Sequence, residues 1–189
     1  MTDILFRDEY IVVCDKPSGL LSEGEAPQKI FPVHRLDRET RGVMVYALCE
    51  KAAASLSLAV AERRMEKEYI ATVVGRLEAS RGEMKDLLFY DRGRNKSFVV
   101  RRERKGVKAA SLEYELLDYN AEEDLSFVRV KLHTGRTHQI RVQFASRGYP
   151  LAGDRKYGAP PSHRSEPSLV AVKLSFPHPI SGEYMTFEL

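Results

Sequence analysis

The stretch that most constrains the fold lies at residues 31–48, where the sequence reads FPVHRLDRETRGVMVYAL. Its last six residues are all apolar or β-branched, which predicts a buried β-strand. The first half places one carboxylate, Asp37, between two arginines and just ahead of a Thr-Arg-Gly turn. An acidic side chain just before a buried strand must be hydrogen-bonded within a turn, paired with a cation or used in catalysis. An Asx-type turn residue is the ordinary interpretation at such a position, so position alone leaves the role of Asp37 open.

Further strand-like segments are spread along the whole chain. Strands are predicted at about residues 4–6, 10–14, 67–74, 110–118, 125–133, 169–176 and 184–188, and helices at about 51–65 and 137–147. Residues 22–30 and 149–168 are polar or rich in Gly, Pro and Ser, which is typical of loops. Many strands with two helices predict an α+β fold with a mixed, mostly antiparallel sheet and a few flanking helices. No internal repeat and no clear linker is visible, so residues 1–189 are expected to form a single domain.

The composition is that of an ordinary soluble globular protein, with 43% hydrophobic and 30% charged residues. The net charge of +3 and the pI near 8.8 permit a polyanionic partner without establishing one. Cys14 and Cys49 each follow apolar residues, which favours reduced core thiols over a disulfide. No apolar run reaches the length of a membrane span, and the N-terminus lacks the layout of a signal peptide. A cytoplasmic protein with no membrane association is therefore expected.

Residues 92–108, RGRNKSFVVRRERKGVK, hold eight Lys or Arg against one acid and are here called the basic segment. A charge run is often only a solvated face. The alternative is a β-hairpin whose turn at residues 104–106 lies on a phosphate backbone. Composition does not decide between these two hypotheses.

Several common catalytic patterns are missing, including a phosphate-binding Gly-rich loop, a Gly-x-Ser-x-Gly elbow and zinc-spaced cysteines. His34, His133 and His138 together with Asp37 could be imagined as metal ligands. However, His133 and His138 are five residues apart across a Gly turn, so they would not share one helical face. Each histidine is more simply explained as a structural residue that donates to backbone, and no metal site is expected.

The remaining candidates are a lone carboxylate, several arginines, a tyrosine in a strand and the basic segment. Residues 132–142, LHTGRTHQIRV, supply Arg136, whose guanidinium beside Asp37 would keep that carboxylate ionised. Such a carboxylate is suited to stabilise positive charge at a sugar carbon, or to attack there as a nucleophile. The basic surface suggests that the sugar belongs to a nucleic acid. The residues by themselves thus indicate glycosidic chemistry on a nucleotide.

Three motifs, HRLDRETRGVMVYAL, EKEYIATVVG and TGRTHQIRVQFASRGYPLAGDRKYG, occur together with DKPSGL near the N-terminus. In order and spacing they resemble the RluA-type family of RNA pseudouridine synthases, and the resemblance covers nearly the whole chain. It implies the pseudouridine synthase catalytic fold, an RNA partner of ribosomal or transfer type, and no cofactor or metal. The family breaks the N1–C1′ bond of uridine, turns the uracil and joins C5 to C1′. A monomer without the small N-terminal S4 domain of many relatives is expected.

The resemblance also implies roles for individual residues. Asp37 matches the catalytic aspartate, which attacks either C1′ or the base, and Arg136 matches the arginine paired with it. Tyr69 matches the tyrosine that stacks on the uracil and is a candidate for handling the C5 proton. The target base must be flipped out of its stack to reach Asp37. The remaining expected contacts are Ile140 packing on the base, Arg35 filling the vacated stack, His138 and Gln139 in substrate binding, and Arg101, Arg102, Arg104 and Lys105 in RNA binding.

The chain departs from the family pattern at three positions. Arg41 stands where a small residue is usual before the Gly, Leu112 where a Thr is usual, and Gln143 where a His is common. None of these positions takes part in the expected chemistry. Arg41 and Leu112 are the two departures expected to alter RNA contacts.

Two other function classes compete with an isomerase. A non-catalytic RNA-binding or RNA-chaperone module on the same fold would need only the basic surface, so the presence of Asp37, Tyr69 and Arg136 argues against it. A metal-dependent nucleotide hydrolase is disfavoured because no paired carboxylates lie near a histidine.

Overall fold

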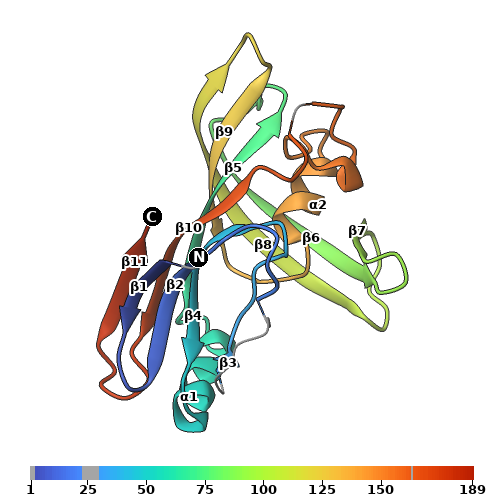
Figure 1. The fold of residues 1–189 in the computed structure, drawn as a ribbon. Coiled ribbons are helices and arrows are strands. Elements are labelled where there is room, and N and C mark those ends of the chain that lie inside the picture. The colour runs from blue at the N-terminus through green and yellow to red at the C-terminus, as the bar shows by residue number, and fades with distance from the viewer. Residues whose placement is uncertain (1–2, 23–29, 163) are drawn as a thin grey trace. The chain divides into compact units, whose positions relative to one another are not determined.

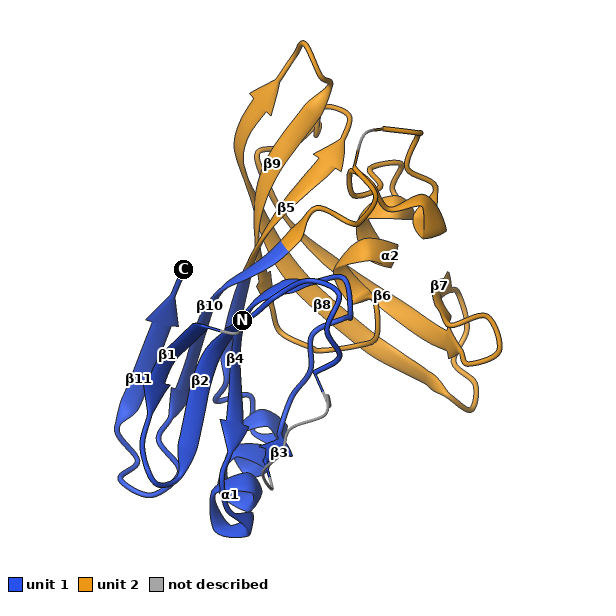
Figure 2. Ribbon diagram, viewed as in Figure 1, with its two compact units in different colours: residues 1–68, 170–189 blue, residues 69–169 orange. Residues whose placement is uncertain are grey.

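The computed structural model describes residues 3–22, 30–162 and 164–189, and the chain divides into two compact units (Figures 1 and 2). Unit 1 comprises residues 1–68 and 170–189, and unit 2 comprises residues 69–169. Their strands and two α-helices make the mixed, mostly antiparallel α+β fold predicted from the sequence. That the two units fold together as a single domain stays a prediction.

The strands of unit 1 are built around β4. Within this unit β2 pairs with β1 and β4, β10 pairs with β4 and β11, and β3 adds to β4 (Figure 1). The β4–β10 pair is parallel and the other four pairs are antiparallel. Asp8 closes the predicted turn between β1 and β2, because its Oδ1 accepts the N–H groups of Tyr10 and Ile11 at 2.7 and 2.8 Å. The bounds are β1 Asp3–Arg7, β2 Ile11–Lys16, β3 Phe31–Pro32, β4 Arg41–Ala47, β10 Leu169–Pro177 and β11 Tyr184–Glu188.

Strand β4 lies at the core of unit 1, which explains its uninterrupted apolar sequence. Every residue from 42 to 47 is buried, and α1, Glu50–Ala61, contacts the strand. Gly42 has φ +138°, and a Cβ there would collide with the carbonyl oxygen of Ala171 on β10. The helix ends before the predicted residue 65 because Arg63 adopts the left-handed conformation, with φ 59°. Both cysteines are free thiols, as predicted, and Cys14 is buried.

Unit 2 contains strands in the order β5-β9-β8-β6-β7, and the β9–β8, β8–β6 and β6–β7 pairs are antiparallel. Helix α2, Gln139–Ala145, contacts β6, β7 and the short 3₁₀ helix η1, Arg155–Tyr157. No helix in the described residues is long and apolar enough to cross a membrane. The bounds are β5 Glu66–Val74, β6 Arg81–Asp91, β7 Lys96–Val100, β8 Val107–Asn120 and β9 Leu125–Leu132.

The prediction of a hairpin with its turn at residues 104–106 is wrong. Strand β7 pairs with β6 through the turn at residues 92–95, and β8 pairs with the other side of β6. Residues 101–106 therefore connect two strands that have β6 between them. The predicted helix at 137–147 is also shorter in the structure, because His138 is left-handed, with φ 53°, and the helix starts only at Gln139.

Candidate active site

Asp37 lies in a turn of unit 1 whose two flanks are held by hydrogen bonds. On one side Leu36 donates its N–H to Ser22 Oγ at 2.9 Å, and its carbonyl accepts from the same hydroxyl at 2.9 Å. On the other side Thr40 N–H donates to the Asp37 carbonyl at 3.0 Å. Leu36, Ser22 and Thr40 are all buried. The backbone that carries Asp37 is thus fixed from both directions, as a preorganised catalytic group requires.

Lys16, the last residue of β2, is a buried residue that hydrogen-bonds to this turn. Its side chain is buried, with 3% of the residue exposed. A buried ammonium has three N–H donors and needs an acceptor for each. Here Nζ donates to the carbonyl oxygens of Pro17 at 2.9 Å, Leu20 at 2.8 Å and Arg38 at 3.3 Å. One cation therefore ties the 17–20 loop to the residue that follows Asp37.

The same loop is joined to the Asp37 turn by three more hydrogen bonds. Gly19 N–H donates to the Arg38 carbonyl at 2.9 Å, and Arg38 Nε donates back to the Gly19 carbonyl at 2.9 Å. Ser18 Oγ donates to the Glu39 carbonyl at 2.7 Å. Gly19 has φ +85°, a conformation that favours glycine. The motif DKPSGL, to which the sequence assigned no role, is thus the structural support of the Asp37 turn.

Arg41, one of the departures from the family pattern, has a partner within unit 1. Its Nη2 and Nε lie 2.6 and 2.9 Å from Asp15 Oδ2. The Asp15 side chain is only 7% exposed, whereas that of Arg41 is 58% exposed. The arginine thus neutralises a buried carboxylate that immediately precedes Lys16.

His34 is a structural histidine, as expected, but it accepts from backbone instead of donating to it. Its Nε2 accepts the N–H of Val45 at 3.2 Å, while Nδ1 is buried without a partner among the described residues. Burial, and next the charge of Lys67, holds the pKa of His34 well below its ordinary value. The Nε2 lone pair of the neutral ring accepts the Val45 N–H, so His34 cannot bind a metal through that atom. Among the residues that the structure describes, no group of three or more His, Cys, Asp or Glu could hold a metal.

The predicted site residues divide between the two units. Asp37 and Arg35 belong to unit 1, and Arg35 is exposed. The unit 2 residues are Tyr69 on β5, Arg136 in the turn before α2, and His138, Gln139 and Ile140 at the start of that helix. Tyr69 and Ile140 are 5% and 3% exposed, respectively. The pairing of Asp37 with Arg136 stays a prediction.

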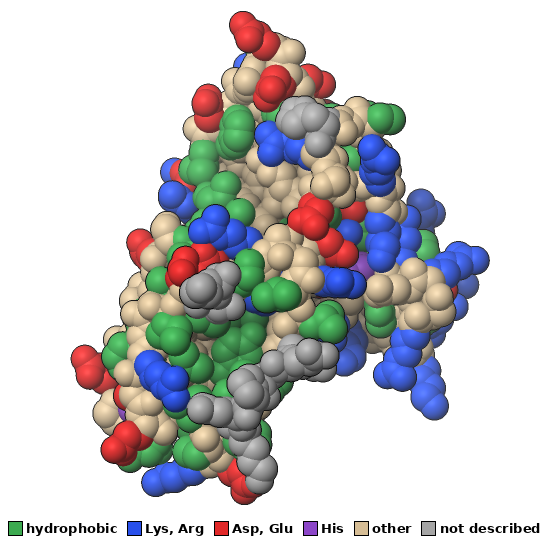
Figure 3. Space-filling view, in the orientation of Figure 1, with side chains coloured by type: hydrophobic (Ala, Val, Ile, Leu, Met, Phe, Trp, Pro, Cys, Tyr) green, Lys and Arg blue, Asp and Glu red, His purple; other side chains and the backbone are tan. Residues whose placement is uncertain are grey.

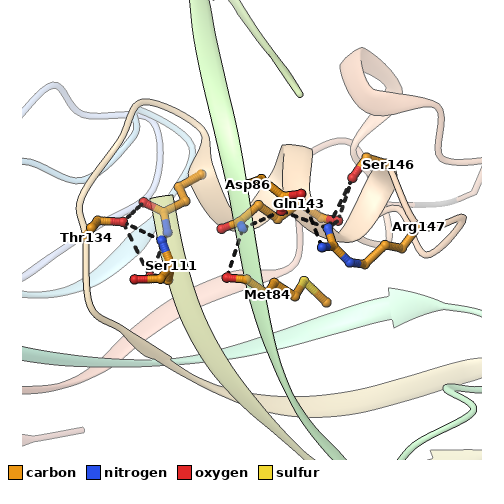
Figure 4. Close-up of polar contacts among 8 residues, drawn as sticks. Met84, Asp86, Ser111, Thr134, Gln143, Ser146 and Arg147 are labelled. Carbon is orange, nitrogen blue, oxygen red and sulfur yellow. Dashed lines mark hydrogen bonds and ion pairs between the residues drawn. The ribbon is translucent and has the colours of Figure 1, made fainter. Parts of the chain in front are cut away.

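Gln139 organises the turn that carries Arg136. Its Oε1 accepts from Thr134 Oγ1 at 2.8 Å and from Arg136 N–H at 3.0 Å, and its Nε2 donates to the Ser111 carbonyl at 3.0 Å. Thr134 Oγ1 in turn accepts the N–H of Ser111 at 2.9 Å (Figure 4). Gln139 is 3% exposed, so these bonds form away from solvent. They give Gln139 a structural task, and its role in substrate binding stays a prediction.

The Arg136 side chain is oriented by a backbone acceptor. Its Nε donates to the carbonyl oxygen of Ala109 on β8 at 3.0 Å. This bond fixes the plane of the guanidinium group and uses only one of its five N–H donors. The Nη groups are the donors that a bidentate pair with a carboxylate requires.

Helix α2 is anchored to β6 through Gln143, the residue found in place of a common His. Its Nε2 donates to Asp86 Oδ2 at 2.7 Å and to the Met84 carbonyl at 3.3 Å (Figure 4). Arg147 Nη1 pairs with the same Asp86 oxygen at 2.9 Å. These bonds hold the helix that carries Ile140 against the sheet.

The basic segment exposes its cations on unit 2. Residues 101–106 are all exposed, and Arg104 lies over the ring of Phe89, 4.6 Å from the ring centroid. In the described part of the chain, Arg101, Arg102, Arg104 and Lys105 form no ion pair. Figure 3 shows Lys and Arg side chains projecting at the right-hand edge, where Figure 1 places β7. These four residues thus present exposed cations that are not held in ion pairs within the described part of the chain.

Comparison with known sequences shows which proteins this chain is similar to. Residues 10–146 match the family model described as RNA pseudouridylate synthase. An uncharacterized RNA pseudouridine synthase of Aquifex aeolicus is 36% identical over 221 aligned positions, which cover 99% of this chain and 68% of that protein. The dual-specificity RNA pseudouridine synthase RluA of Escherichia coli strain K12 is also 36% identical, over 98% of this chain and 91% of RluA.

A solved structure shows the same fold. The human protein named RNA Pseudouridylate Synthase Domain Containing 1 superposes with a TM-score of 0.83, covering 100% of this chain and 83% of its own. The two sequences are 24% identical, so this likeness concerns the fold alone.

Proposed function

Because this chain belongs to the RluA-type family of RNA pseudouridine synthases, which isomerise uridine in RNA to pseudouridine, we propose that Asp37 is its essential carboxylate. The observation that supports this assignment most is the bracing of the Asp37 turn by Lys16, Ser22 and Gly19. A buried ammonium bound to three carbonyls is costly to place, and here it stabilises one short turn. Such support is typical of a side chain that must be held in one position for chemistry.

The reaction requires one glycosidic bond to break and another to form. The N1–C1′ bond of uridine is cleaved, the uracil rotates, and C5 is joined to C1′. The proton that leaves C5 is balanced by the proton that N1 gains, so the product is an isomer of the substrate. Asp37 attacks C1′ or the base, and both routes need the target nucleotide flipped out of its stack.

The other residues have supporting roles in this proposal. Arg136 pairs with Asp37 through its Nη groups and orients the carboxylate for attack. Tyr69 stacks on the uracil and is the candidate for handling the C5 proton, and Ile140 packs on the base. Arg35 fills the space that the flipped base leaves, and His138 and Gln139 bind the substrate.

The exposed cations of the basic segment support binding of RNA phosphates next to the target. Flipping the target base costs about a few kcal/mol in free energy. Phosphate binding by Arg101, Arg102, Arg104 and Lys105 offsets this cost. The target uridine lies in ribosomal or transfer RNA, and the enzyme acts as a cytoplasmic monomer without a metal or cofactor.

Release of tritium from RNA that carries uridine labelled at C5 tests this function. The purified protein should release tritium and form pseudouridine at the same rate with and without EDTA. Release that EDTA abolishes would contradict a metal-free isomerase. Mapping of pseudouridine in total RNA from a deletion strain, with and without complementation, then identifies the target.

A further inference from the structure

The turn between β6 and β7 is joined to the short helix η1, which lies about sixty residues further along the chain. Lys96 Nζ donates to the Lys156 carbonyl at 2.5 Å, and Lys156 Nζ donates back to the Asn95 carbonyl at 3.0 Å. Two lysines therefore use their ammonium groups to hold the two segments together. Residues 92–95 and η1 are here called the turn–η1 surface.

The turn is also closed by bonds of its own. The Arg94 N–H donates to Asp91 Oδ1 at 3.1 Å, and the Tyr90 hydroxyl donates to Asn95 Oδ1 at 2.7 Å. The Asn95 N–H donates to the Arg92 carbonyl at 3.3 Å. The backbone that carries Arg92 and Arg94 is thus held by side chains as well as by its own hydrogen bond.

The turn–η1 surface exposes three arginines, Arg92, Arg94 and Arg155. Among the residues that the structure describes, Arg92 and Arg155 form no ion pair. Arg94 Nε lies 3.8 Å from Asp91 Oδ2, which is beyond hydrogen-bond distance, and the Arg94 side chain is 75% exposed. Guanidinium groups in this state can offer paired N–H donors to phosphate oxygens.

Ser97 on β7 connects this surface to the turn that carries Arg136. Its N–H donates to the Tyr157 hydroxyl of η1 at 2.7 Å, and its Oγ donates to the Thr137 carbonyl at 2.5 Å. Ser97 and Tyr157 are 2% and 8% exposed, so these bonds form away from solvent. Helix α2 also contacts both β7 and η1. The turn–η1 surface therefore lies next to the residue that directly follows Arg136.

Arg104 occupies a different side of the sheet. Leu88 on β6 shares a buried cluster with Val142 of α2. Successive side chains of a strand point to opposite faces, so Phe89 points away from α2. Arg104 lies over the Phe89 ring and hence on the face away from α2. The turn–η1 surface and Arg104 are thus separate groups of cations.

We propose that the turn–η1 surface binds the phosphates of the RNA strand next to the flipped uridine, through Arg92, Arg94 and Arg155. This inference rests on the proposed function, and in particular on the place of Arg136 in the active site. A phosphate backbone is the occupant that suits three exposed guanidinium groups on a fixed framework, because it supplies several anionic oxygens in sequence. Helix η1 then becomes part of the RNA interface, and its contacts add to those of residues 101–105.

Two variants test the inference, Arg155→Gln and the triple variant Arg92→Gln/Arg94→Gln/Arg155→Gln. The control is Arg81→Gln/Lys85→Gln/Arg129→Gln, which removes three exposed cations of unit 2 that pair with Glu115 or Glu83. Binding to bulk transfer RNA and to fragmented ribosomal RNA is measured at several salt concentrations. Acetylation of Lys156 and Lys85, with and without RNA, is measured on the wild type by mass spectrometry.

The slope of log affinity against log salt concentration should fall by about 1 in Arg155→Gln and by about 3 in the triple variant. The control should keep the wild-type slope, and RNA should protect Lys156 from acetylation but not Lys85. A triple variant with the wild-type slope and affinity would overturn the inference while leaving the proposed function intact. Equal acetylation of Lys156 with and without RNA would also overturn it, because the arginines would then act only through their long-range field. A wild type that binds neither RNA and forms no pseudouridine would contradict the proposed function together with the inference.

Discussion

The ammonium of Lys16 lies 3.3 Å from the carbonyl oxygen of Arg38, the residue that directly follows Asp37. Lys16 Nζ also binds the carbonyls of Pro17 and Leu20, so the end of β2 and the Asp37 turn form one hydrogen-bonded unit. Lys16, which has no proposed contact with the substrate, therefore helps to hold the turn that carries Asp37.

Lys16→Met should lower both stability and turnover. The change keeps most of the side-chain volume but removes the Lys16 donor from the carbonyls of Pro17, Leu20 and Arg38, of which Arg38 keeps the Gly19 N–H. This loss costs about 1–3 kcal/mol in the free energy of unfolding. The single-turnover rate should fall about tenfold or more, because the Asp37 turn loses its brace. Lys51→Met, at an exposed position on α1, is the control. Denaturant unfolding and single-turnover assays of both variants check this, and equal behaviour of the two would refute the role of Lys16.

Lys67 should make the free energy of unfolding depend on pH in the alkaline range. Burial lowers its pKa to about 8, against an ordinary value of 10.5. Between these two values the unfolded chain binds more protons at this residue than the folded chain, so the contribution of Lys67 to stability rises with pH. Lys67→Met should therefore be more stable than the wild type below pH 8, and the difference should shrink toward pH 10.5. Urea unfolding across this range measures it, and a difference that stays constant with pH would show that Lys67 is not desolvated.

Much of the fold was predictable because strand patterns are local. The turn at Asp8, the buried β4 and the strands of the C-terminal half follow from alternation, apolar runs and turn residues. Strand β6, with the sequence RGEMKDLLFYD, was missed because charged residues interrupt its apolar positions. The sequence predicted a hairpin with its turn at residues 104–106, whereas β7 pairs with β6. The sequence of one strand does not by itself show which other strand it pairs with.

The candidate site was predictable only where a motif carried chemistry. Asp37, Tyr69 and Arg136 were assigned through the family resemblance and their roles stay predictions, whereas the bonds that Lys16 makes to the Asp37 turn were not predicted. A lysine before Pro-Ser-Gly looks like a solvated turn residue, and nothing local shows that its ammonium is buried against three carbonyls.

Neutralising the basic segment should weaken RNA binding and flatten its salt dependence. Each phosphate contact releases condensed counterions, so changing Arg101, Arg102, Arg104 and Lys105 to Gln should lower the slope of log affinity against log salt concentration by up to about 4. The control changes four other exposed cations to Gln, namely Lys51, Arg63, Arg81 and Arg129. Binding isotherms at several salt concentrations give the slopes. If both variants keep the wild-type affinity and slope, the segment is only a solvated face.

Arg136→Gln should damage catalysis much more than binding. Without the guanidinium, Asp37 loses the bidentate donor that this account gives it, so its carboxylate is no longer oriented for attack. Single-turnover rates at saturating enzyme and RNA binding isotherms measure this for the wild type and the variant. A variant with the wild-type rate and weaker RNA affinity would make Arg136 a phosphate contact instead.

The most direct test of the central claim is the single-turnover rate of pseudouridine formation by Asp37→Asn. This change removes the charge with almost no change in volume, so folding and RNA affinity should stay close to those of the wild type. Glu50→Gln, which neutralises an exposed carboxylate at the start of α1, should retain full activity. The account predicts no measurable tritium release or pseudouridine with Asp37→Asn at saturating enzyme. A rate within about tenfold of the wild type, roughly 1.4 kcal/mol in the barrier, would contradict it.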